Sequence, residues 1–202
     1  MATALHAERF DAALGALRDS GAASVLDLGC GDGDLFLRLA ADPGIRHLTG
    51  IDTDPRAIDR LRRRLASVDT GDRPVALRLA SITGVGTDLA GYDCALMIET
   101  IEHVPPAHLS RMERAVFHHM RPATVVVTTP NAEFNPLLGV PAHRFRHPGH
   151  RFEWSRGQFR DWGRRVARAD GYRVSFADIA GCHPDFGGAS QMAVFQAGEN
   201  GS

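Results

Sequence analysis

The chain has 202 residues, of which 44% are hydrophobic, and a formal net charge of −1. This apolar content can bury one substantial core, so we expect a single domain over residues 1–202, and the near-neutral charge excludes a global attraction to nucleic acid. The chain contains no lysine, which excludes Schiff-base and amine catalysis.

The first residues, Met1-Ala-Thr-Ala-Leu-His6, lack a basic segment and a hydrophobic core, and the longest apolar stretches are the size of a strand. We therefore expect no signal peptide, no membrane span and a cytoplasmic protein. The cysteines Cys30, Cys94 and Cys182 are odd in number and far apart in the sequence, so we expect reduced thiols.

The helical spacing of Leu5, Phe10, Leu14 and Leu17 predicts an N-terminal helix. Strand-like and helical patterns then alternate. Strands are predicted at 24–28, 47–51, 75–79, 92–98 and 124–128, and helices at 35–41, 55–65 and 106–118. A loop at 131–149, a helix at 155–169 and late strands at 172–179 and 191–196 complete the chain. The alternation predicts an α/β doubly wound parallel sheet, with ligands bound beyond the carboxyl ends of its strands. The polar residues at these ends are Asp52, Ser81, Glu99 and Asn131.

A glycine-rich turn follows the first strand in Val25-Leu-Asp27-Leu-Gly29-Cys-Gly31-Asp-Gly33-Asp34. Roughly 20 residues later Asp52 ends the next strand, where it can bind ribose hydroxyls. The dinucleotide fingerprint requires Gly or Ala where Asp34 stands, and an acidic side chain there would repel a pyrophosphate. Asp27 also suits a ligand that carries an ammonium and a sulfonium. The turn resembles motif I of the class I S-adenosylmethionine methyltransferases; NAD and a turn used only for packing are the weaker alternatives.

A second set of polar residues follows the strand at 92–98. Glu99, Glu102 and His103 share one side if the segment forms a helical turn, and the downstream His150 is the favoured fourth group. Two carboxylates with imidazoles suit Mn²⁺, and Mg²⁺ nearly as well, whereas Zn²⁺ prefers thiolates.

Three segments together resemble the small-RNA 3′-terminal 2′-O-methyltransferases, the Hua-enhancer methyltransferase family. They are Glu99-Thr-Ile-Glu102-His103-Val, Thr129-Pro130-Asn131-Ala-Glu133-Phe134-Asn135 and His150-Arg-Phe152-Glu153-Trp154-Ser-Arg156-Gly-Gln-Phe159. The resemblance covers nearly the whole chain as that family's catalytic domain. It implies a Rossmann-like class I methyltransferase fold with a mostly parallel seven-stranded sheet and a C-terminal antiparallel hairpin.

The resemblance also implies the site residues. Asp27, Gly29, Gly31 and Asp52 would hold S-adenosylmethionine, leaving S-adenosylhomocysteine as product, with Ser81 at the neighbouring strand end. Glu99, Glu102, His103 and His150 would bind Mn²⁺ or Mg²⁺, and His147 is left outside this ligand set. The expected reaction is methyl transfer to the 2′-hydroxyl of the 3′-terminal nucleotide of RNA, with His103 as the base.

The RNA contacts are expected in the arginine-rich segment 144–173. Arg144, Arg146, Arg151 and Arg156 are candidates for phosphate binding, and Phe152 or Trp154 for stacking on the last base. A solvated arginine-rich helix face is the competing interpretation of this segment. The high Arg, Ala and Gly content and the compact length favour a bacterial origin, and because the first helix follows almost directly, we expect a domain excised from a longer protein. The resemblance implies RNA repair or small-RNA protection, with an RNA end-healing kinase-phosphatase as partner through sequence outside this chain.

Two other functions remain open from the sequence. The first is a metal-assisted small-molecule O-methyltransferase that acts on a catechol or vicinal diol, because two adjacent oxygens on a metal pose the same chemical problem. The second is a cofactor-binding or RNA-binding module without turnover.

Overall fold

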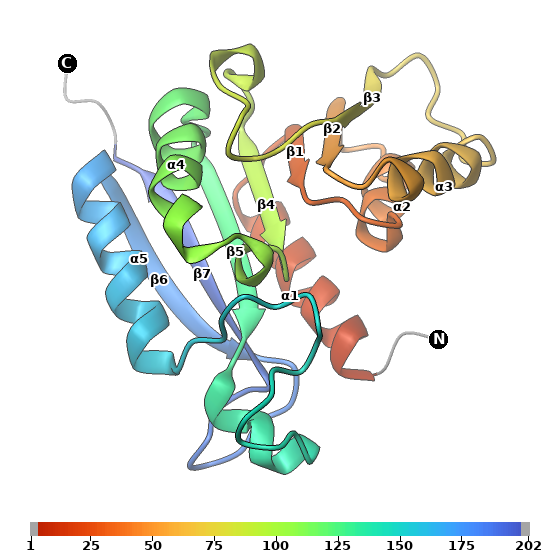
Figure 1. Cartoon of the computed structure of the whole chain (residues 1–202). Coiled ribbons are helices and arrows are strands. Elements are labelled where there is room, and N and C mark those ends of the chain that lie inside the picture. Colours follow the sequence, from red (N-terminus) through yellow and green to blue (C-terminus); the bar gives the residue numbers. More distant parts are fainter. Residues whose placement is uncertain (1–3, 199–202) are drawn as a thin grey trace.

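The computed structural model describes residues 4–198, which form a seven-stranded sheet with helices on both faces (Figure 1). The strand order is β3-β2-β1-β4-β5-β7-β6. The parallel part consists of β1 (Ser24–Leu28), β2 (His47–Asp52), β3 (Val75–Leu79), β4 (Cys94–Ile98) and β5 (Thr124–Pro130). The last two strands, β6 (Tyr172–Ile179) and β7 (Ser190–Ala197), form an antiparallel hairpin, and β7 also runs antiparallel to β5. The predicted fold class is thereby confirmed.

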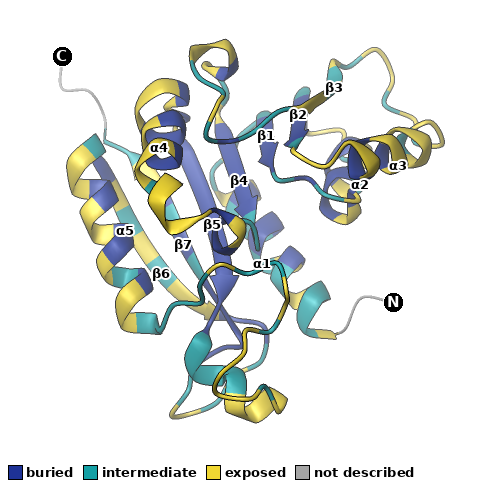
Figure 2. Ribbon diagram, in the orientation of Figure 1, coloured by how far each residue is buried: buried dark blue, intermediate teal, exposed yellow. Residues whose placement is uncertain are grey.

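Successive residues of the central strands pack into two separate hydrophobic cores, one on each face of the sheet. Val25 packs with α1 (Ala4–Asp19), α2 (Asp34–Ala41) and α3 (Pro55–Leu65), whereas its neighbour Leu26 packs with α4 (Leu109–Glu113) and α5 (Arg156–Asp170). Successive side chains of a strand point to opposite faces, so a strand covered on both faces is apolar throughout. Figure 2 shows the result, with β1, β4 and β5 dark blue between two helical layers. Each fully buried leucine or phenylalanine contributes about 1.5–3 kcal/mol.

Local sequence sets the helix ends that the site depends on. The α3 helix begins after Asp54, whose carboxylate accepts from the Arg56 amide, with a proline in the first turn. The α5 helix begins with a capping box between Ser155 and Gln158 and ends at Gly171, which has a φ of 74°. The predicted helix at 155–169 is therefore found with its bounds moved by one residue at each end.

Two segments differ in type of structure from the sequence prediction. The helix predicted at 106–118 is a 3-10 turn (Pro106–His108), the short α4, and a π-helical segment (Arg114–Met120). The widened π-helical segment buries Ala115, Val116, Phe117 and Met120 in one core, which a uniform helical spacing does not reveal. The loop predicted at 131–149 contains a 3-10 helix (Ala132–Leu138), because the side chain of Asn131 accepts from the Glu133 amide and starts a helical turn.

The strand predicted at 92–98 begins at Cys94, since Asp93 uses its side chain to accept from the amides of Ala23 and Ser24. Among residues 4–198, no helix is long and apolar enough to cross a membrane.

Candidate active site

A cavity of about 830 Å³ opens at the carboxyl ends of β1, β2 and β4. It brings together residues that are far apart in the sequence. Those predicted for the site that line it are Gly29, Gly31, Asp52, Ser81, Glu99 and His103. His147, which the sequence interpretation left outside the ligand set, lines it too. The glycine turn and the Glu99–His103 segment therefore share one cavity, as the predicted topology required.

The glycine turn is held tightly against the ends of β2 and β4. The amides of Gly29 and Cys30 both donate to the carbonyl of Ile51, at 2.8 and 3.0 Å. Gly29 has a φ of 92°, and a Cβ placed on it would lie 2.5 Å from Cγ2 of Thr100. Only glycine combines this backbone conformation with this close approach. At Gly29 the turn therefore presents backbone, not a side chain, to the cavity wall.

Asp52 is fixed by two backbone amides. Its Oδ2 accepts from the Gly31 amide and its Oδ1 from the Asp54 amide, both at 2.8 Å. The carboxylate therefore has one orientation at the cavity wall and keeps lone pairs free to accept from a vicinal diol such as ribose. Ser81, on the same cavity, bonds to the hydroxyl of Thr83 at 2.9 Å.

Asp27 lies behind the cavity wall and is not one of the residues that line it. It is 3% exposed, and its Oδ2 has no hydrogen-bond partner within residues 4–198. Burial, together with the negative charge of Asp52, raises the pKa of Asp27 to about 7. The sequence interpretation gave Asp27 a part in holding the cofactor; in the structure Asp27 lies beneath the glycine turn, behind the residues that line the cavity.

Glu99 and Glu102 occupy the turn that follows β4. Glu99 has a φ of 52°, an uncommon conformation for a residue with a side chain. Its Oε1 accepts from the Thr128 hydroxyl at 3.1 Å, and its Oε2 lies 3.5 Å from the guanidinium of Arg9 in α1. Burial raises the pKa of Glu99, against the opposing effect of Arg9.

Glu102 is completely buried in the 3-10 turn Ile101–His103. Its Oε2 accepts from the Thr129 hydroxyl at 2.9 Å, but its Oε1 has no hydrogen-bond partner among the described residues and lies 3.9 Å from Nε2 of His150. Burial, reinforced by Glu99, raises the pKa of Glu102 well above its ordinary value. A buried carboxylate oxygen without a partner costs free energy unless a proton or a cation satisfies it.

Three imidazoles cluster together, and one of them, His150, approaches the carboxylate of Glu102. One ring nitrogen from each of His103, His147 and His150 lies within 4.8 Å of the other two. The ring centroid of His103 lies 4.9 Å from that of His150 and 5.6 Å from that of His147. Burial lowers the pKa of His103, and His150 and His147 lower it further. Imidazoles beside a buried carboxylate are a donor set that fits a divalent cation such as Mn²⁺.

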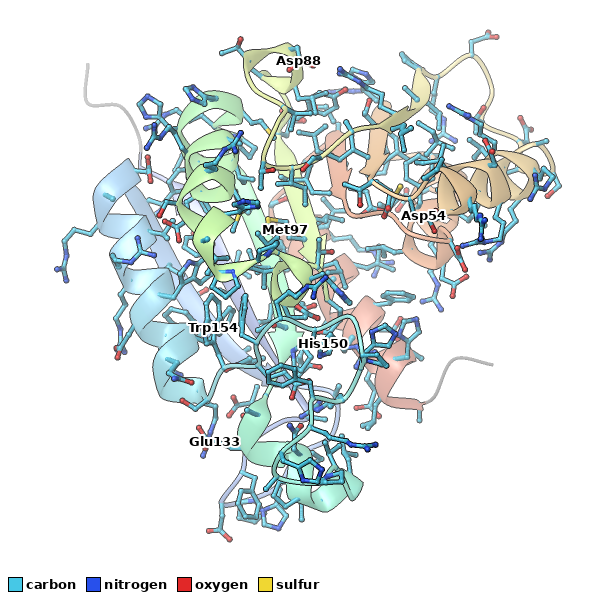
Figure 3. All side chains as sticks on the ribbon, viewed as in Figure 1. Asp54, Asp88, Met97, Glu133, His150 and Trp154 are labelled. Carbon is cyan, nitrogen blue, oxygen red and sulfur yellow. The ribbon has the colours of Figure 1, made fainter. Side chains whose placement is uncertain are left out.

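His150 is oriented by Glu153, a residue whose role the sequence left open. Nδ1 of His150 lies 2.5 Å from Oε1 of Glu153, which also accepts from the Arg146 amide at 2.7 Å. Burial acts to raise the pKa of Glu153, but these hydrogen bonds and one from Asn135 outweigh it and lower the pKa. An ionised carboxylate behind an imidazole is the usual support of a metal-binding histidine. Figure 3 shows His150 on the loop that precedes α5, with Trp154 further along toward that helix.

The residues predicted to bind RNA divide into two groups. Arg144 and Arg151 are exposed. The others already have partners inside the protein. The guanidinium of Arg146 donates to Asn135 and to the carbonyls of Asn131 and Ala189, and Arg156 pairs with Glu133 at 2.8 Å.

The aromatic residues Phe152 and Trp154 are half-buried, with ring centroids 4.4 Å apart. Trp154 continues the stack to Trp162 at 5.4 Å between ring centroids.

Asn131, expected to face the crevice, is fully buried, and its Nδ2 donates to the carbonyls of Phe186 and Gly188 at 2.7 and 2.9 Å. These side chains link the segment before α5 to the end of the sheet.

Known proteins are similar to this chain in sequence and in fold. A family model described as a methyltransferase domain matches residues 25–123. The small RNA 2′-O-methyltransferase of Mus musculus is 38% identical over 162 residues, which are 77% of this chain and 40% of the mouse protein. That of Gallus gallus is 34% identical over 203 residues, covering 95% of this chain and 53% of the relative. The chain thus spans about half or less of these curated relatives.

A solved structure covers the chain almost completely. The methyltransferase domain of a bacterial Hen1 protein is 34% identical, has a TM-score of 0.86, and is matched over 96% of this chain and 99% of its own length. The site of this chain combines a glycine turn, a fixed Asp52 and an adjoining cluster of carboxylates and imidazoles. By these similarities the chain belongs to the small-RNA 2′-O-methyltransferase (Hen1) family and corresponds to its methyltransferase domain.

Proposed function

We propose that the chain transfers the methyl group of S-adenosylmethionine to the 2′-hydroxyl of the 3′-terminal nucleotide of RNA. The observation that carries this proposal is that the cofactor cavity and the carboxylate and imidazole cluster share a wall, because Glu99, His103 and His147 line the same cavity as Asp52. A methyl donor in that cavity and a hydroxyl held by the cluster would be close enough to react.

Residues around the glycine turn would bind the cofactor. Asp52 would accept from the ribose hydroxyls, and the backbone at Gly29 and Gly31 allows the cofactor to approach without contact from a Cβ. Ser81, which lines the same cavity, would add a hydroxyl. Asp27, behind the turn, would contribute negative charge toward the positively charged cofactor through the wall.

Glu99, Glu102, His103 and His150 are the proposed ligands of Mn²⁺ or Mg²⁺. The unpartnered Oε1 of Glu102, 3.9 Å from Nε2 of His150, supports this assignment. A divalent cation, when bound, supplies Lewis-acid stabilisation of the negative charge that develops on the attacking oxygen.

His103 is also the proposed base. Its Nδ1 lies 3.1 Å from the carbonyl of Gly149, which can only accept, so Nδ1 carries the proton and the lone pair is on Nε2. That single lone pair can bind a cation or take the proton of the 2′-hydroxyl, but not both at once. A His103→Asn variant decides between the two: loss of Mn²⁺ affinity indicates a ligand, and loss of turnover with affinity retained indicates a base.

RNA recognition would rely on the exposed Arg144 and Arg151, since Arg146 and Arg156 have partners inside the protein. We keep Phe152 as the proposed stacking surface, because it is half-exposed at the end of the aromatic stack that Trp154 continues inward. That residues 1–202 act as one domain of a longer protein, beside an RNA end-healing kinase-phosphatase, stays a prediction.

The test is transfer of labelled methyl from S-adenosylmethionine to a short RNA with terminal 2′ and 3′ hydroxyls, in Mn²⁺, Mg²⁺ or EDTA. A matched RNA with a 2′-deoxy end is the control, and a catechol tests small-molecule methylation. We expect metal-dependent labelling that the 2′-deoxy end abolishes. Labelling of the catechol alone would refute the proposal.

A further inference from the structure

The segment His147-Pro-Gly-His150 forms a tight turn beside the cavity. The amide of His150 donates to the carbonyl of His147 at 3.1 Å, with proline and glycine at the two central positions. Proline and glycine favour such turns because they adopt the required backbone angles at low cost. The turn brings two imidazoles of the same loop to within 5.5 Å between ring centroids.

Gly149, inside this turn, bonds to two imidazoles with opposite polarity. Its carbonyl lies 3.1 Å from Nδ1 of His103, and its amide donates to Nδ1 of His147 at 3.0 Å. A carbonyl can only accept and an amide can only donate. In the neutral rings, Nδ1 of His103 is therefore protonated, whereas Nδ1 of His147 holds the lone pair.

The Nε2 atoms of His103 and His147 then have opposite hydrogen-bonding roles, one as acceptor and one as donor. The carboxylate of Glu153 accepts from Nδ1 of His150, so His150 resembles His103 and presents a lone pair on Nε2. His147 presents an N–H on Nε2 instead. One nitrogen from each of the three rings lies close enough to the other two to suggest one metal site. The lone pair of His147, however, is on Nδ1, where it already accepts from the Gly149 amide.

We propose that His147 is a hydrogen-bond donor to the RNA and not a metal ligand: its Nε2–H binds an acceptor oxygen of the terminal nucleotide. This inference rests on the proposed function for the identity of the substrate. It is supported by the place of His147 on the cavity wall and by its exposure, which leave the ring open to a ligand. Gly149 thus sets the tautomers of both rings, so that Nε2 of His103 can accept and Nε2 of His147 can donate.

The space around Gly149 supports this arrangement. A Cβ placed on Gly149 would lie 3.0 Å from Nδ1 of both His103 and His147. A side chain there would push against both rings at the nitrogens that make these hydrogen bonds. A Gly149→Ala variant should therefore disturb both imidazoles together.

The tautomers are tested first, without RNA or metal. Long-range proton–nitrogen correlation spectra of the ¹⁵N-labelled protein, recorded above the ordinary histidine pKa of about 6.5, separate the two neutral tautomers. The signals of each ring are assigned by their loss in single variants. We expect a protonated Nε2 in His147 and a protonated Nδ1 in His103 and His150. A protonated Nδ1 in His147 would overturn the proposal.

The role of the donor is tested with a matched pair of variants. His147→Asn places its side-chain amide near the position of Nδ1 and can still accept from Gly149, but it lacks a donor at the position of Nε2. His147→Gln extends its amide to that position. We expect the Asn variant to lower kcat/KM for RNA by about 2- to 12-fold, mainly through KM, and the Gln variant to recover most of this loss.

Electron paramagnetic resonance titration with Mn²⁺ alone gives the readout that separates a donor from a ligand. Mn²⁺ affinity should be unchanged in both His147 variants and should fall in His150→Asn. A parallel fall in His147→Asn, or kcat/KM equal to that of the unaltered protein, would refute the proposal. If the unaltered protein labels no RNA at all, the proposed function fails, while the tautomer assignment is still decided by the spectra.

Discussion

Replacing Asp27 by asparagine should stabilise the protein without cofactor and weaken its binding of S-adenosylmethionine. In the folded protein, burial and Asp52 raise the pKa of Asp27 from 3.8 to about 7. The folded state therefore binds this proton more tightly than the unfolded chain does, and stability falls as the pH rises from about 4 to about 7. The full difference corresponds to at most about 4 kcal/mol. We expect about 1–3 kcal/mol after relaxation around the buried charge.

The assay is urea unfolding of the unaltered protein and Asp27→Asn at about pH 4 and about pH 8, where the two curves should nearly coincide at the lower pH and separate at the higher. Asp93→Asn is a control of opposite sign, because hydrogen bonds from the amides of Ala23 and Ser24 lower the pKa of Asp93 against a smaller effect of burial. Isothermal titration with S-adenosylmethionine measures the loss of affinity. An Asp27→Asn variant that gains no stability at the higher pH would refute the reasoning.

Three further changes test the site. Glu102→Gln should retain the fold and the bond from Thr129 but lose Mn²⁺ binding by paramagnetic resonance, and retained affinity would remove Glu102 from the ligand set. Glu153→Gln should weaken Mn²⁺ binding by about 10- to 100-fold by releasing His150, and unchanged affinity would show that this support is dispensable. Gly29→Ala should cost about 1–3 kcal/mol in urea unfolding through its positive φ and its contact with Thr100, and unchanged stability would contradict the tight packing of the turn against that side chain.

The sequence by itself determined most of the fold. Parallel strands covered on both faces are continuous apolar runs, so β1, β2 and β5 could be located from residue type alone. Motif spacing then placed Asp52 beside the glycine turn, because residues at the carboxyl ends of adjacent parallel strands meet at one edge. The short spacing of Glu99 and His103 placed both in the segment that follows β4. These predictions depend on local periodicity and on one general rule of sheet topology.

Tertiary structure decided which polar groups are free. The sequence grouped Arg146 with Arg144 as phosphate ligands, but the guanidinium of Arg146 donates to backbone carbonyls from two distant segments. The sequence also could not show that Arg9 in α1 reaches Glu99, or that His147 lies beside His103 at the cavity. Hydrogen bonds between residues far apart in the chain leave no periodic trace in the sequence. Whether an arginine or histidine is engaged or available is therefore fixed only when the chain has folded.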